Sequence, residues 1–166
     1  MKKVMLVLSM LCFLIGGGFS RAQAQEAKSA FSLNLGVQTN FSNDSSFDNA
    51  WFTLDLRAGI GVGRTLAICP EIMAAVDDSL NFDAVWLYPG LLLNLKLGGR
   101  FFIGAGAVLP VIVYEGESSS GRVSPKINLG YRAGHLNLTA YLIAWNEEFV
   151  DFFDLNQIGA TIGFTF

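Results

Sequence analysis

The chain has 166 residues, a length that suits one domain and leaves no room for a second large one. Hydrophobic residues make up 52% of it and charged residues only 15%, with 18 glycines, a composition that is unusual for a soluble protein. The formal net charge is −3 and the Lys and Arg residues are scattered singly, which excludes nucleic acid as a partner.

The N-terminus has the three parts of a secretory signal. Two lysines precede an apolar run over residues 4–15, and Ala22-Gln23-Ala24 offers the small residues of a cleavage site. We therefore predict a signal peptide over residues 1–24 and one mature domain over residues 25–166. A retained membrane anchor is disfavoured because the apolar run is short, and a lipoprotein because the residues before Cys12 are not small.

The mature chain alternates apolar and polar residues with the period of a β-strand. Residues 31–38 show this alternation, and residues 52–62 repeat it after a polar gap. Six later segments follow the same period, namely residues 66–76, 84–95, 101–114, 122–133, 136–145 and 155–166. Each is close to the length, about 10 residues, that a tilted strand needs to cross a bilayer.

The connections between these segments alternate between long and short. The long ones are residues 42–50, 77–83, 115–121 and 146–154, and the short ones lie near residues 63–65, 96–100 and 134–135. Long outer loops and tight periplasmic turns are typical of outer-membrane barrels. With an even number of strands, we expect both mature termini on the periplasmic side.

The apolar and polar faces must be assigned to lipid and lumen, because a soluble lipocalin-like barrel would alternate as well. An eight-stranded barrel has an interior only just wide enough for side chains, so the Leu, Ile, Val and Phe residues of all the strands cannot fit inside. The opposite parity is rich in glycine and polar residues, which suit a tight lumen. We therefore predict an all-β fold, a transmembrane antiparallel up-and-down β-barrel of about eight strands, with aromatic residues at its interfaces.

The C-terminal sequence Gly163-Phe164-Thr165-Phe166 resembles the closing strand of bacterial outer-membrane barrels, which end in an aromatic residue. The nearest class is the small OmpA/OmpX-type barrel, a porin-like outer membrane protein domain. This resemblance implies location in the outer membrane of a Gram-negative cell envelope. It also implies insertion by the barrel assembly machinery, with Phe164 and Phe166 as the assembly signal.

Four prolines interrupt the predicted strands and cannot donate to the hydrogen-bond ladder. We expect bulges or strand ends at Pro70, Pro89, Pro110 and Pro125. The strand register is least defined around them.

Few charged residues have the parity of the lumen. They are Asp55, Arg57, Glu71, Lys126 and Arg132. Folding the second and third strands about the turn at Arg64 places Arg57 opposite Glu71, where buried opposite charges should pair. We interpret the five residues as a polar network that fills the lumen; a narrow ion path or a small-ligand site is the alternative.

No catalytic, cofactor-binding or metal-binding constellation stands out. Enzymatic outer-membrane barrels that modify lipids use a histidine with a serine or carboxylate near the outer rim. The only histidine, His135, falls at a predicted periplasmic turn beside Gly134. The sequence therefore predicts no cofactor and no enzyme, with a lipid-modifying enzyme as the second alternative.

The predicted outer loops are acidic. Their carboxylates are Asp44, Asp48, Asp77, Asp78, Asp83, Glu115, Glu117, Glu147, Glu148, Asp151 and Asp154. Carboxylate oxygens bind divalent cations, which could bridge the rim to lipopolysaccharide, although a merely solvated rim has the same composition. The leading hypothesis is a non-enzymatic barrel with a structural role in envelope integrity or in surface interaction. A narrow pore or small-solute binder is its rival.

Overall fold

The computed structural model describes residues 29–41, 50–77, 82–144 and 156–166. The predicted signal peptide lies outside these ranges and stays a prediction. Within them, no helix is long and apolar enough to cross a membrane.

Antiparallel strands make up nearly all of the described chain. They are β1 (Ala30–Phe41), β2 (Ala50–Val62), β3 (Leu66–Asp77), β4 (Ala84–Leu97), β5 (Phe101–Val108), β6 (Val111–Tyr114), β7 (Glu117–Ser120), β8 (Ser124–Ala133), β9 (Leu136–Ala144) and β10 (Asn156–Thr165). Strands β1 to β5 and β8 to β10 pair around a closed ring, because β1 pairs with both β2 and β10, and β3 pairs with both β2 and β4. The predicted all-β barrel of eight antiparallel strands is confirmed.

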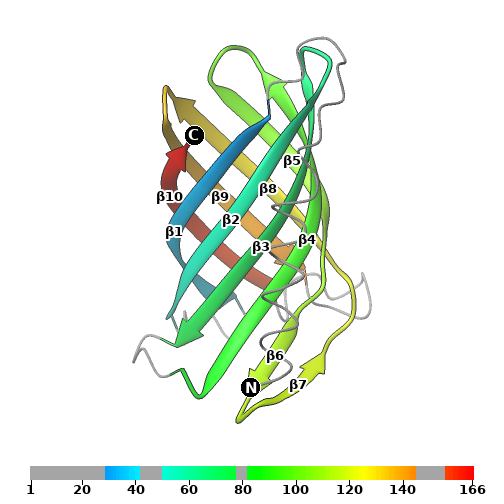
Figure 1. Cartoon of the computed structure of the whole chain (residues 1–166), viewed down its shortest axis with the longest axis vertical. Coiled ribbons are helices and arrows are strands. Elements are labelled where there is room, and N and C mark those ends of the chain that lie inside the picture. The colour runs from blue at the N-terminus through cyan, green and yellow to red at the C-terminus, as the bar shows by residue number, and fades with distance from the viewer. Residues whose placement is uncertain (1–28, 42–49, 78–81, 145–155) are drawn as a thin grey trace.

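The strands run obliquely around the barrel, as Figure 1 shows. The short turns at residues 63–65, 98–100 and 134–135 lie at the end that carries the C-terminus, which we call the turn end. Each turn contains a glycine with a left-handed backbone, Gly63, Gly98 or Gly134, a conformation that costs glycine little. The opposite end is called the loop end.

The loop predicted over residues 115–121 is wrong. Strand β6 continues the line of β5 along β4, and it turns tightly at Glu115-Gly116 into β7, which pairs with it. Both turn residues have positive φ. The result is a two-stranded hairpin that projects beyond the loop end (Figure 1). The sequence ESSS in β7 lacks apolar alternation, so its strand character comes from pairing with β6.

Only one of the four prolines adjoins a bulge. Val108 pairs with Ser124, and Pro110 accepts a backbone hydrogen bond from Gly121. One residue, 109, lies between these pairs on the β5–β6 side, whereas two residues, 122 and 123, lie between them on the β7–β8 side. Pro110 separates β5 from β6, and the extra residue is accommodated there. At Pro70 the β2–β3 ladder misses two pairs while its register continues unchanged. Pro89 lies inside paired strands, so neither a bulge nor a strand end is found at Pro70 or Pro89. Pro125 is the second residue of β8, which agrees with the strand end expected there.

The two parities face the sides that the sequence analysis assigned to them. Polar residues on the lumen parity are buried, among them Ser32, Asn34, Gln38, Thr53, Asn128 and Thr139. Large apolar residues of the other parity are exposed in seven strands of the ring, for example Leu35, Leu54, Leu93, Ile103, Leu129 and Ile162, and those of β3 are half-buried. An exposed band of this kind is the surface that lipid covers in a transmembrane barrel.

Glycines on the lumen parity make room for large inward side chains. A Cβ placed on Gly159 of β10 would overlap the ring of Tyr141, which belongs to the neighbouring strand β9. The ring therefore lies flat over the Gly159 backbone, and its hydroxyl donates to Gln38 Oε1 at 3.1 Å.

Replacing Gly159 by valine should destabilise the barrel, because Tyr141 must move and its bond to Gln38 is broken. We expect the free energy of unfolding to fall by about 1 to 3 kcal/mol, the usual cost of overpacking, in urea titrations of protein refolded into lipid vesicles. Ala160→Val is the matched control, since Ala160 is the next residue and is exposed on the outer face. Equal losses in the two variants would contradict this packing.

Candidate functional site in the barrel lumen

A chain of polar contacts crosses the lumen from strand to strand. Asn137 of β9 donates to Asn34 of β1 at 3.1 Å, and Asn34 donates to Asp55 Oδ2 of β2 at 3.3 Å. Arg57 then links Asp55 to β3, because its Nη2 lies 2.7 Å from Asp55 Oδ2 and its Nε lies 3.2 Å from Glu71 Oε2. Arg57 stands opposite Glu71 in the β2–β3 register, which sets this contact.

Lys126 completes the chain from the far side of the barrel. Its Nζ lies 2.6 Å from Glu71 Oε1 and 4.6 Å from the centre of the Tyr141 ring. The side chain is only 1% exposed, so its charge depends on these partners. We call Asp55, Arg57, Glu71 and Lys126 the ionic belt. It contains two acids and two bases, and it is neutral as a set.

Arg132 lies apart from the ionic belt. It is in β8 at the turn end, and among the described residues no salt bridge joins it to a carboxylate. Its guanidinium carbon lies 5.9 Å from the centre of the Phe102 ring. Of the five lumen charges singled out from the sequence, the structure brings four together and leaves Arg132 outside.

Several buried polar atoms of the lumen have no hydrogen-bond partner among the described residues. They include Asp55 Oδ1, Arg57 Nη1, Asn94 Oδ1, both amide atoms of Asn128, Asn137 Oδ1 and Thr139 Oγ1. Buried polar atoms of this kind are normally satisfied by ordered water. The lumen around the ionic belt is therefore polar enough to hold water.

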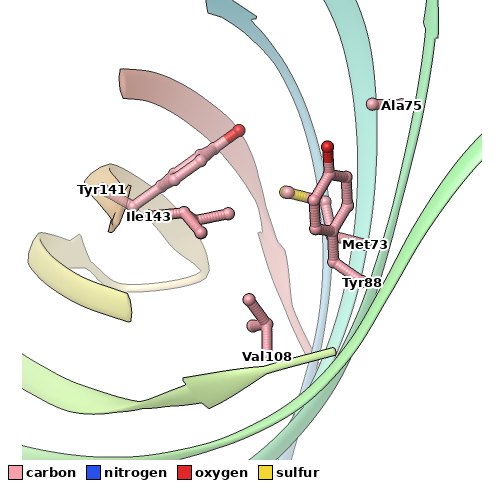
Figure 2. Packing of buried hydrophobic residues seen from close by; sticks show 6 residues of the cluster. All are labelled: Met73, Ala75, Tyr88, Val108, Tyr141 and Ile143. Carbon is pink, nitrogen blue, oxygen red and sulfur yellow. The ribbon is translucent and has the colours of Figure 1, made fainter. Parts of the chain in front are cut away.

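An apolar cluster, which was not predicted from the sequence, also fills part of the lumen. Its members are Met73, Ala75, Tyr88, Val108, Tyr141 and Ile143. Figure 2 shows Tyr141 and Ile143 pointing from one wall towards Met73 and Tyr88 on the other. Trp51 and Trp86 pack against the cluster and stack on each other at 5.7 Å between ring centres. Parity from Glu71 would have predicted Met73 and Ala75 to point inward.

The apolar cluster is joined to the barrel wall by hydrogen bonds. Gln38 accepts from the Tyr141 hydroxyl at 3.1 Å, and its amide donates to the Tyr88 hydroxyl at 3.4 Å. These contacts satisfy the polar ends of two buried tyrosines. The lumen thus contains an ionic belt and an apolar cluster, which are in contact where Lys126 lies over the Tyr141 ring.

The remaining candidate residues lie away from the lumen. His135 is exposed in a turn at the turn end, and its Nδ1 lies 2.8 Å from the carbonyl oxygen of Thr165. Phe164 and Phe166 are exposed on the outer face, 59% and 74% respectively. Among the described residues, no group of three or more His, Cys, Asp or Glu side chains could hold a metal ion.

Only part of the acidic rim can be placed. Asp77, Asp83, Glu115 and Glu117 lie at the loop end. The other predicted rim acids, Asp44, Asp48, Asp78, Glu147, Glu148, Asp151 and Asp154, lie outside the described residues.

Comparison with solved structures identifies the fold. Neisserial surface protein A superposes with a TM-score of 0.56 at 11% identity, over 85% of this chain and 98% of that one. A de novo designed transmembrane β-barrel gives 0.52 at 15% identity, over 86% and 98%. A second designed barrel, solved by NMR, gives 0.50 at 10% identity, over 85% and 97%. No family model and no curated protein sequence matches the chain.

The chain therefore has the fold of the small outer-membrane β-barrels of the OmpA/OmpX type. At these identities the likeness concerns fold alone. What distinguishes this barrel is the set of side chains in its lumen.

Removing one charge of the ionic belt should lower the free energy of unfolding more than removing two charges that pair with each other. Lys126→Met leaves Glu71 and Asp55 with Arg57 as their only base, so we expect a loss of about 3 to 5 kcal/mol in the free energy of unfolding. The double variant Lys126→Met/Glu71→Gln should recover part of that loss.

Lys96→Met is the control for this pair of variants, because Lys96 is an exposed base on the lumen parity of β4 at the turn end. It should unfold like the unmodified protein in the same urea titration. A double variant as unstable as the sum of the two single variants would show that Lys126 and Glu71 do not interact.

Proposed function

We propose that this protein is a non-enzymatic integral outer-membrane β-barrel with a plugged lumen, and that it contributes to envelope integrity or to surface interaction. The observation that carries the proposal is the filling of the lumen cross-section. The ionic belt is buried, and Met73, Tyr88 and Ile143 of the apolar cluster are each 0% exposed. A barrel closed in this way contributes through its outer wall and its loops.

The outward surface supports a membrane location. Exposed Leu, Ile, Val and Phe side chains surround the described barrel, and such a surface would aggregate in water. The orientation that we propose places the turn end and both mature termini in the periplasm and the loop end outside the cell.

The proposed partners follow from the residues at the two ends of the barrel. Asp77, Asp83, Glu115 and Glu117 at the loop end would face lipopolysaccharide, and divalent cations would bridge the like charges. The exposed aromatic rings of Phe164 and Phe166 would be recognised by the barrel assembly machinery during biogenesis.

The role of the C-terminal aromatic residues in assembly can be tested separately from their role in folding. Phe166→Ser should lower the amount of barrel assembled in the outer membrane of living cells several-fold. It should leave refolding into detergent micelles unchanged, because the side chain is 74% exposed and contributes little to the packed lumen. Phe101→Ser, an exposed ring at the start of β5, is the control. Equal assembly of the two variants in cells would contradict an assembly role for Phe166.

A narrow pore or small-solute binder is the second candidate function. The unpartnered polar atoms around the ionic belt favour it, because a water-filled path needs such atoms. The two candidates differ at the apolar cluster, which water and ions would have to pass.

Single-channel recording in planar bilayers separates the two candidates. After a heat-dependent gel shift has verified folding, we expect the mature protein to give no steady openings. Tyr88→Ala/Ile143→Ala should give measurable conductance, because it removes two large side chains from the apolar cluster. Leu93→Ala/Leu95→Ala, on the outer face, is the control and should stay silent. Steady openings of the unmodified protein, with ion selectivity altered by Glu71→Gln, would overturn the plugged lumen and support the pore.

A further inference from the structure

The lumen widens at the turn end into a cavity of about 430 Å³. Arg64, Lys96, Arg100 and Arg132 line this cavity, and no Asp or Glu of the described chain does. We call the cavity with these four bases the basic vestibule. It is the counterpart of the ionic belt, where each base faces a carboxylate.

Arg132 is the innermost unpaired base of the vestibule. It is half-buried, and its Nε is shielded from solvent without a hydrogen-bond partner. The Phe102 ring lies beside the guanidinium, and the Arg132 backbone N–H is fixed by the Arg100 carbonyl at 2.7 Å. The side chain is thus held over the cavity by contacts that do not neutralise it.

Among the exposed bases of the rim, Arg100 has a hydrogen-bond partner. Arg100 Nη1 donates to the Tyr131 hydroxyl at 3.1 Å, and this bond raises the pKa of the Arg100 guanidinium above its ordinary value. Arg64 comes from the first short turn and Lys96 from the end of β4, so the bases that line the cavity come from separate parts of the wall.

Four bases around one cavity repel one another unless an anion lies between them. Burying part of a guanidinium without a counter-charge or hydrogen-bond partner is costly. We propose that the basic vestibule binds a phosphate group, with Arg132 as its innermost ligand. A phosphate carries up to two charges and several acceptor oxygens, which suit a set of arginines and lysines better than a single carboxylate.

Two sources of phosphate fit the geometry. One is a soluble phosphorylated molecule that enters from the open end of the barrel. The other is the headgroup of a phospholipid in the adjoining leaflet, because Leu97 and Phe101 are exposed on the outer face beside Lys96 and Arg100 and place the rim next to lipid. Phosphate binding in the basic vestibule does not depend on whether the lumen conducts ions.

Calorimetric titration with pyrophosphate tests the proposal in the mature protein refolded into octyl glucoside, a detergent without phosphate. We expect saturable binding that chloride at equal ionic strength does not reproduce. Arg132→Gln should weaken it about tenfold or more, as expected for loss of a charge-assisted hydrogen bond. Lys96→Gln, an exposed position that should fold normally, provides a second variant and should weaken binding as well. Arg122→Gln is the control, because Arg122 precedes β8 at the opposite end of that strand.

The source of the phosphate is decided in nanodiscs of phosphatidylglycerol. If the lipid headgroup occupies the vestibule, pyrophosphate should bind more weakly than in octyl glucoside. Native mass spectrometry should then find phosphatidylglycerol retained on the unmodified protein and lost from Arg132→Gln. Unchanged pyrophosphate affinity in the nanodiscs would support the soluble source. The absence of both pyrophosphate binding and retained lipid would overturn the proposal, as would an equal loss in Arg122→Gln.

Discussion

The narrow interior of an eight-stranded barrel is the constraint on which the rest of this structure depends. Side chains of one parity must fit into a space that is only just wide enough for them, so every large inward residue needs a small one beside it. Tyr141 occupies the space that the missing side chain of Gly159 leaves free. Most of the large aliphatic residues are thereby placed on the outer face, where lipid replaces the core of a soluble protein, and Val108 and Ile143 are among the few in the lumen.

The same confinement explains the composition of the ionic belt. In a narrow lumen shielded from solvent, an unpaired charge is costly, and equal numbers of acids and bases lower that cost through direct contacts. Glu71 contacts both bases, because one of its oxygens accepts from Arg57 and the other accepts from Lys126. The apolar cluster fills a further part of the lumen with side chains that carry no charge. The vestibule differs, since Arg132 has no carboxylate beside it.

Much of the fold could be predicted from the sequence, because a period of two residues assigns each side chain to a face once one face is known. The three short turns and the register of Arg57 with Glu71 follow from such local reasoning. The β6–β7 hairpin does not, since β7 has no alternation of its own and forms by pairing with β6. The contact between Lys126 and Glu71 and the apolar cluster could not be predicted from the sequence either. They depend on which strands face each other across the lumen, a property of barrel tilt and stagger that no single segment encodes.

The similarity to designed barrels shows which residues of this chain the fold itself does not require. Designed proteins have the same fold at 15% identity or less, so the fold does not depend on one particular set of residues. The architecture therefore places few demands on the identity of the lumen residues beyond size and pairing. Where a residue departs from what packing and pairing require, as Arg132 does, the fold offers no reason for it. Such residues are where this barrel's particular chemistry should be looked for.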